Sequence, residues 1–234
     1  MPATLQESYN TGEDNQDAFF GINWAAQTFT TLSAYDISSV KVKVYRTGSP
    51  GTVTCHLRDT TGGKPSGPDR AIGTTQGNDF GTDGGGTWVE ITFNTSYSLS
   101  SGVMYAIVLD NASGVAANRG NWKKDASGPT YTGGANQYSS NSGVDWTTYT
   151  AADNMFETWG EGKTYSELAG TIAAVSDVSG NLDTTLVSTL SGTIAAVSTV
   201  SGNLGSTTVA IDVTTSYIKR LVVAGKDSIY YESV

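Results

Sequence analysis

The sequence is short of several residue types, and each shortage limits what the protein can do. It contains a single cysteine, Cys55, so no disulfide can form within the chain. No stretch approaches the roughly 18 apolar residues of a membrane-spanning helix, and the first residues lack the basic and apolar segments of a secretory signal. We therefore expect no membrane span and no signal peptide.

Basic residues are also scarce. The chain has 13 Lys and Arg against 22 Asp and Glu, which gives a net charge of −9. The Lys and Arg residues before residue 162 are scattered along the chain and form no basic stripe. Because such a chain does not attract a phosphate backbone, we expect no nucleic-acid partner.

Residues for catalysis are few as well. His56 is the only histidine, and because it follows Cys55 directly in a predicted strand, the two side chains cannot meet as a nucleophile–base pair. Cys55 is expected to face the core and His56 to face solvent or a sheet edge.

The chain has no Gly-x-Ser-x-Gly motif, no phosphate-binding loop and no zinc-ligand spacing. Five carboxylates remain as candidates for a glycosidase pair, none of them within a signature: Asp79, Asp83, Glu90, Asp145 and Asp153. We predict that the protein is not an enzyme, and a glycan hydrolase is only the third hypothesis.

Strand patterns fill residues 1–161. Val40, Val42 and Val44 alternate with polar residues, and the segments 52–59 and 87–93 alternate in the same way. Residues 103–109 form an apolar run typical of a strand covered on both faces, and 154–160 form a last short strand. Gly-rich turns separate these segments, and the chain contains 28 glycines but only 15% charged residues. This pattern predicts a mainly β protein that begins with a jelly-roll β-sandwich.

A repeat of 22 residues follows the predicted sandwich. Residues 168–189 and 190–211 are identical at 15 of 22 positions. Apolar residues recur at gaps of three and four, and the period equals two 11-residue units, which predicts a helical stalk with a right-handed repeat over residues 162–206. The stripe consists of Leu168, Ile172, Val175, Leu182, Leu186, Leu190, Ile194, Val197 and Leu204, together with Val178 and Val200.

The predicted stalk is too weak to stand alone. Glycine and Ser/Thr in each copy disfavour an isolated helix, so we expect the stripe to be covered by identical chains in a parallel coiled-coil homotrimer. Two alternatives remain open: an irregular Ser/Thr-rich linker, and a β-solenoid or intertwined β stalk, because Val, Thr and Gly also suit strands. Residues 207–234 return to a β pattern around "AGKD", which predicts a small β cap or attachment hairpin.

Several segments in order carry a resemblance to a known family. They are "AAQTFTT" (25–31), "ISSVKVKVYRTGSPGTVTCHLRDTTGGKPSG" (37–67), "WVEITFNTSYSLSSGVMYAIVL" (88–109), "YTGG" (131–134) and "SGVDWTTYTAADNMFETWG" (142–160). Residues 5–161 resemble the jelly-roll modules called choice-of-anchor domains, found in bacterial surface and phage proteins and similar in architecture to carbohydrate-binding modules. The repeat resembles "VSGNL"-type repeats of phage tail fibres. The resemblance implies a β-sandwich displayed on a surface, and for Trp146 a structural role.

Two sets of residues are candidate binding sites. Trp122, with polar neighbours on both sides, joins Tyr131 and Tyr138 as a platform on which a glycan could stack; alternatively these rings pack under loops or against other subunits. Trp24, Trp88 and Trp159 are expected in the core. Glu13, Asp14, Asn15 and Asp17 offer the hard oxygen ligands that calcium prefers, and jelly-roll modules often hold a structural calcium, as the resemblance implies. The alternative for this set is a solvated acidic loop. We expect no other cofactor.

These observations predict a non-catalytic virion structural protein, such as a phage fibre or a capsid or tail decoration. Its sandwich would attach to a surface or a host glycan, and trimerisation would raise the avidity of weak contacts. Its partners would be other virion proteins, and its location would be the virion surface. The alternative is a carbohydrate-binding or adhesion module of a bacterial cell-surface protein.

Overall fold

A computed structural model describes residues 2–169, 177–182, 186–191 and 199–204 of the chain. The chain divides between Gly162 and Lys163 into two compact units. The predicted boundary lies one residue earlier. Each unit is described by itself.

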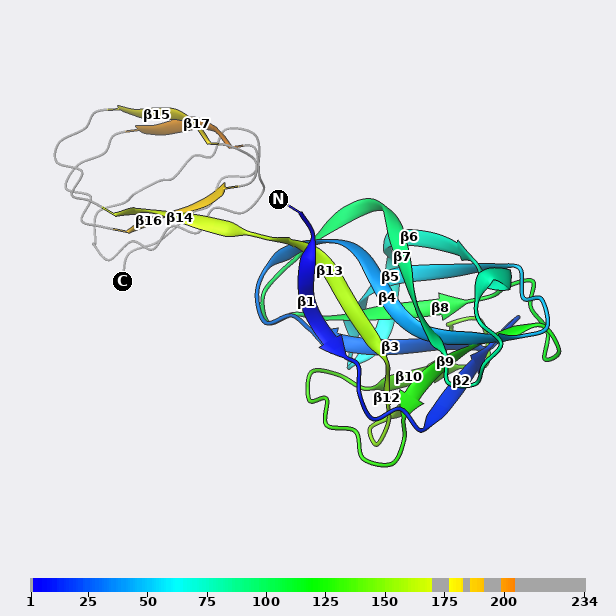
Figure 1. The fold of residues 1–234 in the computed structure, drawn as a ribbon. Helices are drawn as coiled ribbons and strands as arrows, with labels where there is room; N and C mark the ends of the chain where they lie inside the picture. The colour runs from blue at the N-terminus through cyan, green and yellow to red at the C-terminus, as the bar shows by residue number, and fades with distance from the viewer. Residues whose placement is uncertain (1, 170–176, 183–185, 192–198, 205–234) are drawn as a thin grey trace. The chain divides into compact units, whose positions relative to one another are not determined.

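The first unit consists of antiparallel strands joined by turns and longer loops (Figure 1). In chain order they are β1 (Thr4–Tyr9), β2 (Asn15–Phe19), β3 (Trp24–Thr30), β4 (Tyr35–Thr47), β5 (Thr52–Thr61), β6 (Lys64–Gln76), β7 (Thr87–Leu99), β8 (Met104–Asp110), β9 (Arg119–Asp125), β10 (Asn136–Ser139), β11 (Thr147–Tyr149), β12 (Asp153–Asn154) and β13 (Phe156–Gly162). A 3-10 turn at Gly77–Asp79 follows β6.

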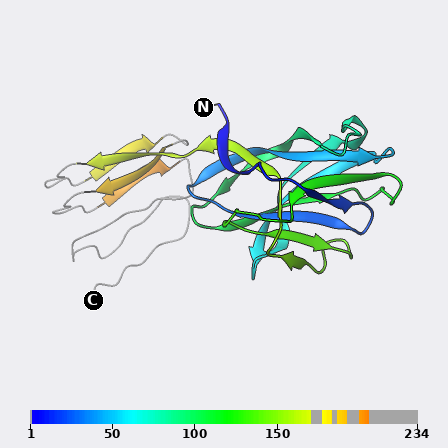
Figure 2. The ribbon, with the colours of Figure 1, turned by 60° about the horizontal axis from the view of Figure 1, so that its bottom comes forward.

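The strands form one curled sheet whose two halves pack face to face, as the predicted sandwich requires (Figure 2). In the first layer β4 pairs with β7 on one edge and with β13 and β9 on the other. β1 adds to β13, while β2 and β12 add to β9. The second layer has the order β6-β5-β8-β3-β10-β11.

The two layers meet where β6 crosses β7. Their only paired residues are Gly73 and Phe93. A Cβ atom at Gly73 would overlap the carbonyl oxygen of Thr92. The chain therefore needs glycine where the two backbones approach this closely.

Alternate residues of both layers build the core. Val40, Val42 and Val44 of β4 face Cys55 and Leu57 of the second layer, and all five are fully buried. The period-two pattern of these segments predicted which side of each strand faces inward. All three tryptophans expected in the core lie elsewhere. Trp24 packs on the outer face of the second layer. Trp88 is 36% exposed, and the half-buried Trp159 carries the Lys41 ammonium 4.1 Å from its ring centre.

The second unit overturns the predicted helical stalk. Its described residues form β14 (Thr164–Ala169), β15 (Asp177–Leu182), β16 (Leu186–Ser191) and β17 (Thr199–Leu204). β14 pairs in parallel with β16, and β15 pairs in parallel with β17. Each residue pairs with the residue 22 positions later, so the sequence period is the register of parallel strands. This arrangement corresponds to the β-solenoid alternative.

Some residues of the predicted stripe lie in these paired strands, and others lie outside the described residues. Leu168 pairs with Leu190, and Leu182 with Leu204, while Leu186 pairs with Thr164. Parallel pairing at a fixed offset places like residues beside each other, which a helix stripe does not require. Ile172, Val175, Ile194 and Val197, and the predicted cap at 207–234, lie outside the described residues. The homotrimer stays a prediction.

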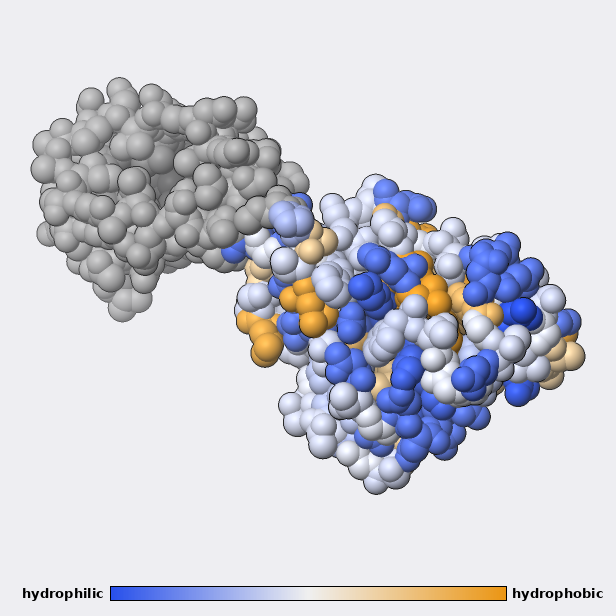
Figure 3. All heavy atoms as spheres, viewed as in Figure 1, coloured by the Kyte–Doolittle hydropathy of each residue, from blue (hydrophilic) through white to orange (hydrophobic). Residues whose placement is uncertain are grey.

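The surface of the first unit is mostly hydrophilic on the side that Figure 3 shows, with hydrophobic residues in small separate groups. Such scattered groups are normal for a solvated surface. Within the part of the chain that the structure describes, no helix has the length and hydropathy needed to cross a membrane.

Candidate functional site

A second side-chain cluster covers the outer face of the second layer. Ala26, Ala106 and Val108 project from β3 and β8 on the side opposite to the core and are fully buried. Trp146, from the loop between β10 and β11, packs over them, and the half-buried Trp24 at the start of β3 packs alongside. This face therefore carries aromatic rings on a rigid sheet.

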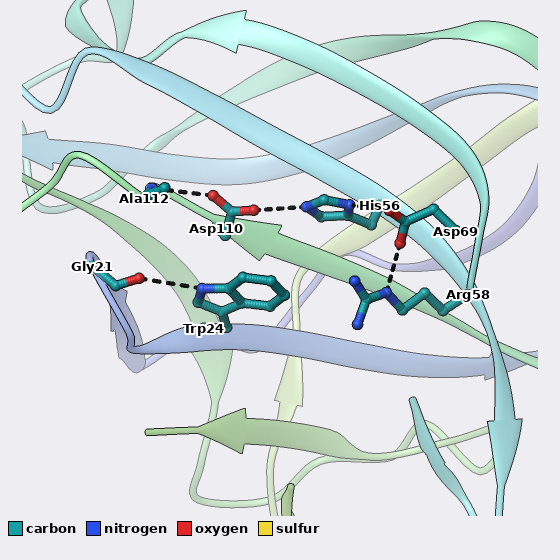
Figure 4. A network of polar contacts seen from close by, with 7 residues as sticks. All are labelled: Gly21, Trp24, His56, Arg58, Asp69, Asp110 and Ala112. Atoms are coloured by element: carbon teal, nitrogen blue, oxygen red, sulfur yellow. Dashed lines mark hydrogen bonds and ion pairs between the residues drawn. The ribbon is translucent and has the colours of Figure 1, made fainter. Parts of the chain in front are cut away.

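His56 lies on the same face, held between two carboxylates (Figure 4). Its Nε2 lies 2.7 Å from Asp110 Oδ2, and its Nδ1 lies 3.0 Å from Asp69 Oδ2. The indole ring of Trp24 stacks on the imidazole, with ring centres 5.6 Å apart and planes inclined by 10°. The expectation that His56 faces solvent is wrong, because its β-strand neighbours supply partners that cover it.

The two carboxylates set the charge of His56. Burial of the ring lowers its pKa, but the hydrogen bond to Asp110 and the charge of Asp69 together raise the pKa above its ordinary value. Burial of Asp69 raises its own pKa, and the hydrogen bond from Arg58 together with the charge of His56 outweighs this and lowers that pKa. The geometry therefore favours a protonated imidazole.

Arg58, two residues after His56 on β5, completes the cluster. Its Nε donates to Asp69 Oδ1 at 2.7 Å, and its guanidinium carbon lies 5.5 Å from the centre of the Trp24 ring. The side chain of Arg58 is 16% exposed. Its two terminal nitrogens have no hydrogen-bond partner among the described residues. Arg58 thus reaches solvent beside an aromatic ring with two donors uncommitted.

The surrounding loops hold the Trp24 ring in place. Trp24 Nε1 donates to the Gly21 carbonyl at 3.2 Å. Gly143 has a φ of +76°, and a Cβ atom there would come within 2.8 Å of the Trp24 ring, so this loop position requires glycine. The Asp145 N–H donates to Asn141 Oδ1 at 2.9 Å, which ties the loop that carries Trp146.

The predicted glycan platform is not brought to an exposed face. Trp122 is fully buried, and its Nε1 donates to the Met155 carbonyl at 2.8 Å. Tyr131 packs against the core with its ring centre 5.3 Å from that of Phe156, and Tyr138 packs against the core as well. Because β9 points Trp122 between the layers, this ring presents no face to a ligand.

The predicted calcium loop is committed to protein partners. Glu13 pairs with Lys43, which lowers the pKa of the Glu13 carboxyl, and Asp17 pairs with Lys124. The other two residues, Asp14 and Asn15, accept hydrogen bonds from the backbone N–H groups of residues 126 and 16. Among the described residues no three His, Cys, Asp or Glu side chains gather as metal ligands.

Several buried acceptors lie on β3, β10 and β12. Asp153 Oδ1 accepts from Gln27 Nε2 at 2.8 Å, and both side chains are at most 2% exposed. Asn136 Oδ1 and Asn154 Oδ1 are buried without a donor in the described part of the chain. Burial, helped by the charge of Asp125 and opposed by the Gln27 hydrogen bond, raises the pKa of Asp153 to about 6. Oxygen atoms of these residues are the ligands that a hard cation would use here.

The polar groups around His56 are engaged by protein partners. Both ring nitrogens of His56 face carboxylates, and Asp110 also accepts the Ala112 N–H at 3.1 Å. Cys55 lies on the opposite side of β5 in the core, where burial raises the pKa of its thiol. The Cys55 thiol and the His56 ring therefore lie on opposite sides of β5 and cannot act together on one substrate.

Sequence reasoning missed most of this cluster. Alternation along β5 does place His56 and Arg58 on one face, which was a usable signal. Asp69 and Asp110 reach that face only because β6 and β8 flank β5. The pairing of these strands cannot be predicted from any single segment of the sequence.

Comparisons with known proteins give a distant structural likeness. No family model matches the chain, and no curated protein matches it. A solved structure of the cysteine protease and lectin-like domains of Cwp84, a surface layer associated protein of Clostridium difficile, superposes with a TM-score of 0.43 at 14% identity. The match covers 69% of this chain and 36% of that one.

Proposed function

We propose that the protein is a non-catalytic carbohydrate-binding module of a bacterial cell-surface protein, and that it binds glycans through the outer face of the second layer. The observation that carries the proposal is the pair formed by Trp24 and Arg58, an aromatic ring beside a guanidinium with free donors. Sugars are recognised by aromatic faces together with a few fixed polar groups.

The support around this pair favours specific binding. Asp69 forms hydrogen bonds with both Arg58 and His56, and Gly143 packs against the Trp24 ring. The site is therefore ordered before a ligand binds. A site ordered in advance loses little conformational entropy on binding. The engagement of both oxygens of Asp69 and of Asp110 with protein donors is the reason for proposing binding without catalysis.

A glycan array followed by calorimetry tests the proposal. We expect the Trp24→Ala variant to bind the best array hit about tenfold more weakly, because an aromatic anchor is lost. Trp88→Ala removes an exposed tryptophan of the first layer and should bind like the natural protein. Trp24→Phe, which keeps an aromatic face, should fall between them.

Two outcomes would refute the proposal. One is the absence of any saccharide ligand for the full chain. The other is a Trp24→Ala variant that keeps its near-ultraviolet circular dichroism and binds as well as Trp88→Ala does. Labelled protein applied to intact bacterial cells tests whether the glycan is displayed on such cells, since the label should be lost with Trp24→Ala and kept with Trp88→Ala.

A virion appendage is the second candidate, because a repeat in a 22-residue parallel register suits an elongated display unit. Light scattering on the full chain tests the homotrimer that accompanies this candidate. A monomer would remove the avidity argument and leave the glycan-binding proposal untouched.

A further inference from the structure

Around Trp24 the carboxylate acceptors have protein partners, whereas some of the donors do not. Every carboxylate oxygen of Asp69 and Asp110 accepts a protein hydrogen bond. The donors are not used up: both terminal nitrogens of Arg58 lack an acceptor, and so does the indole nitrogen of Trp146 within the described residues. A ligand at this face therefore meets donors and finds no free carboxylate.

We propose that this face takes a carboxylate-bearing glycan, a saccharide that contains a hexuronic acid, with Arg58 as the residue that binds the carboxylate. The inference rests on the proposed glycan-binding function and names the ligand class. Arginine presents its terminal N–H groups in a planar fork that matches the two oxygens of a carboxylate. A hydroxyl group can engage only part of this fork.

The placement of Arg58 suits this role. Asp69 holds the guanidinium through Nε, and neither terminal nitrogen is used by this contact. The half-buried Trp24 ring has the His56 imidazole stacked on it, and its centre lies 5.5 Å from the guanidinium carbon. A sugar whose carboxylate Arg58 binds would therefore contact only the exposed part of this ring.

The charge of the whole chain makes Arg58 decisive for an anionic ligand. A net charge of −9 opposes the approach of an anion. His56 and Arg58 balance Asp69 and Asp110 locally when the imidazole is protonated. Removing the charge of Arg58 should therefore weaken the binding of an acidic sugar much more than that of its neutral counterpart.

Calorimetry with matched saccharides tests the inference. The probes are galacturonic and glucuronic acid oligosaccharides, in both anomeric linkages, and the neutral galactose and glucose oligosaccharides of the same linkage and length. The natural protein should bind one acidic probe about tenfold more tightly than its neutral counterpart, as expected for a charge-assisted bidentate contact. Arg58→Gln should abolish this preference, and Arg58→Lys should restore only part of it. Arg70→Gln removes an exposed arginine that pairs with Asp59 and should leave the preference unchanged.

The outcomes separate the two proposals. If neutral probes bind as tightly as acidic ones, or if Arg58→Gln keeps the acidic preference, the inference is overturned. If in addition the neutral binding is lost in Trp24→Ala, the proposed function stands without it. If neither class of probe binds and the glycan array is empty, both proposals fall.

Discussion

Replacing Asp153 with asparagine should stabilise the protein at neutral and alkaline pH and have little effect in acid. The carboxyl is 2% exposed, and burial raises its pKa from 3.8 to about 6. The protonated acid is therefore favoured in the folded state. Its contribution to stability is complete below the unfolded pKa of 3.8 and is lost as pH rises through about 6. The amide of Asp153→Asn stays neutral and keeps an oxygen for the Gln27 donor.

The size of the effect follows from the two pKa values. The difference between 3.8 and about 6, at about 1.4 kcal/mol for each pH unit, gives about 3 kcal/mol in favour of the variant at about pH 8. The variant also adds an N–H group to a cluster in which Asn136 Oδ1 and Asn154 Oδ1 lack a donor. Both considerations favour the variant.

Urea unfolding, followed by tryptophan fluorescence from about pH 4 to about pH 8, measures the effect. A chelator is present in one series and calcium in another. The gap between variant and natural protein should open between about pH 4 and about pH 7, while Asp79→Asn, at an exposed aspartate, should show no such change. A variant that is less stable than the natural protein at about pH 8 would refute the reasoning. If that occurred only with calcium, a bound cation would be neutralising the carboxylate.

Three further predictions concern other parts of the chain. Gly134→Ala should lower the unfolding free energy by about 2 kcal/mol or more, because its Cβ would overlap the Thr28 carbonyl oxygen, while Gly84→Ala, with open space around it, should be neutral in the same denaturation assay. His56→Gln should destabilise the protein most below about pH 6.5, since the stability from a raised histidine pKa is lost as pH rises through that pKa; equal losses in melting temperature at acid and alkaline pH would contradict this. Inserting a second copy of residues 168–189 after residue 189 should preserve the parallel register and strengthen the β signal in circular dichroism, whereas the same insert shortened by two residues should not.

The strand faces of the first unit were predictable because alternation is a local property. The side chains of Val40 to Val44, and of Cys55 and Leu57, lie where a period of two places them. The same rule separated Cys55 from His56. What covers the outer side of such a strand is not local, and here the sequence reading of His56 failed.

The tryptophans illustrate the same limit. Trp122 has polar neighbours in the sequence, yet β9 pairs with the end of β4 and turns this ring between the layers. Trp24 lies near the first predicted strand and was expected inside, but it lies on the outer face beside Arg58. Exposure of a ring depends on which strand and which loop lie over it, and that pairing joins residues far apart in the chain.

The sequence by itself determined the alternating core faces, the 22-residue period and the shortage of catalytic groups, because each is a matter of spacing or composition. It did not determine the state of the repeat: gaps of three and four allow a helix, and the fixed offset equally allows the parallel strands that the structure contains. Only the tertiary structure decided that His56, Arg58, Asp69 and Asp110 share a site, because hydrogen bonds between β5, β6 and β8 bring them together. Side-chain chemistry follows from the sequence, but its convergence depends on strand order, which the whole chain settles through long-range packing.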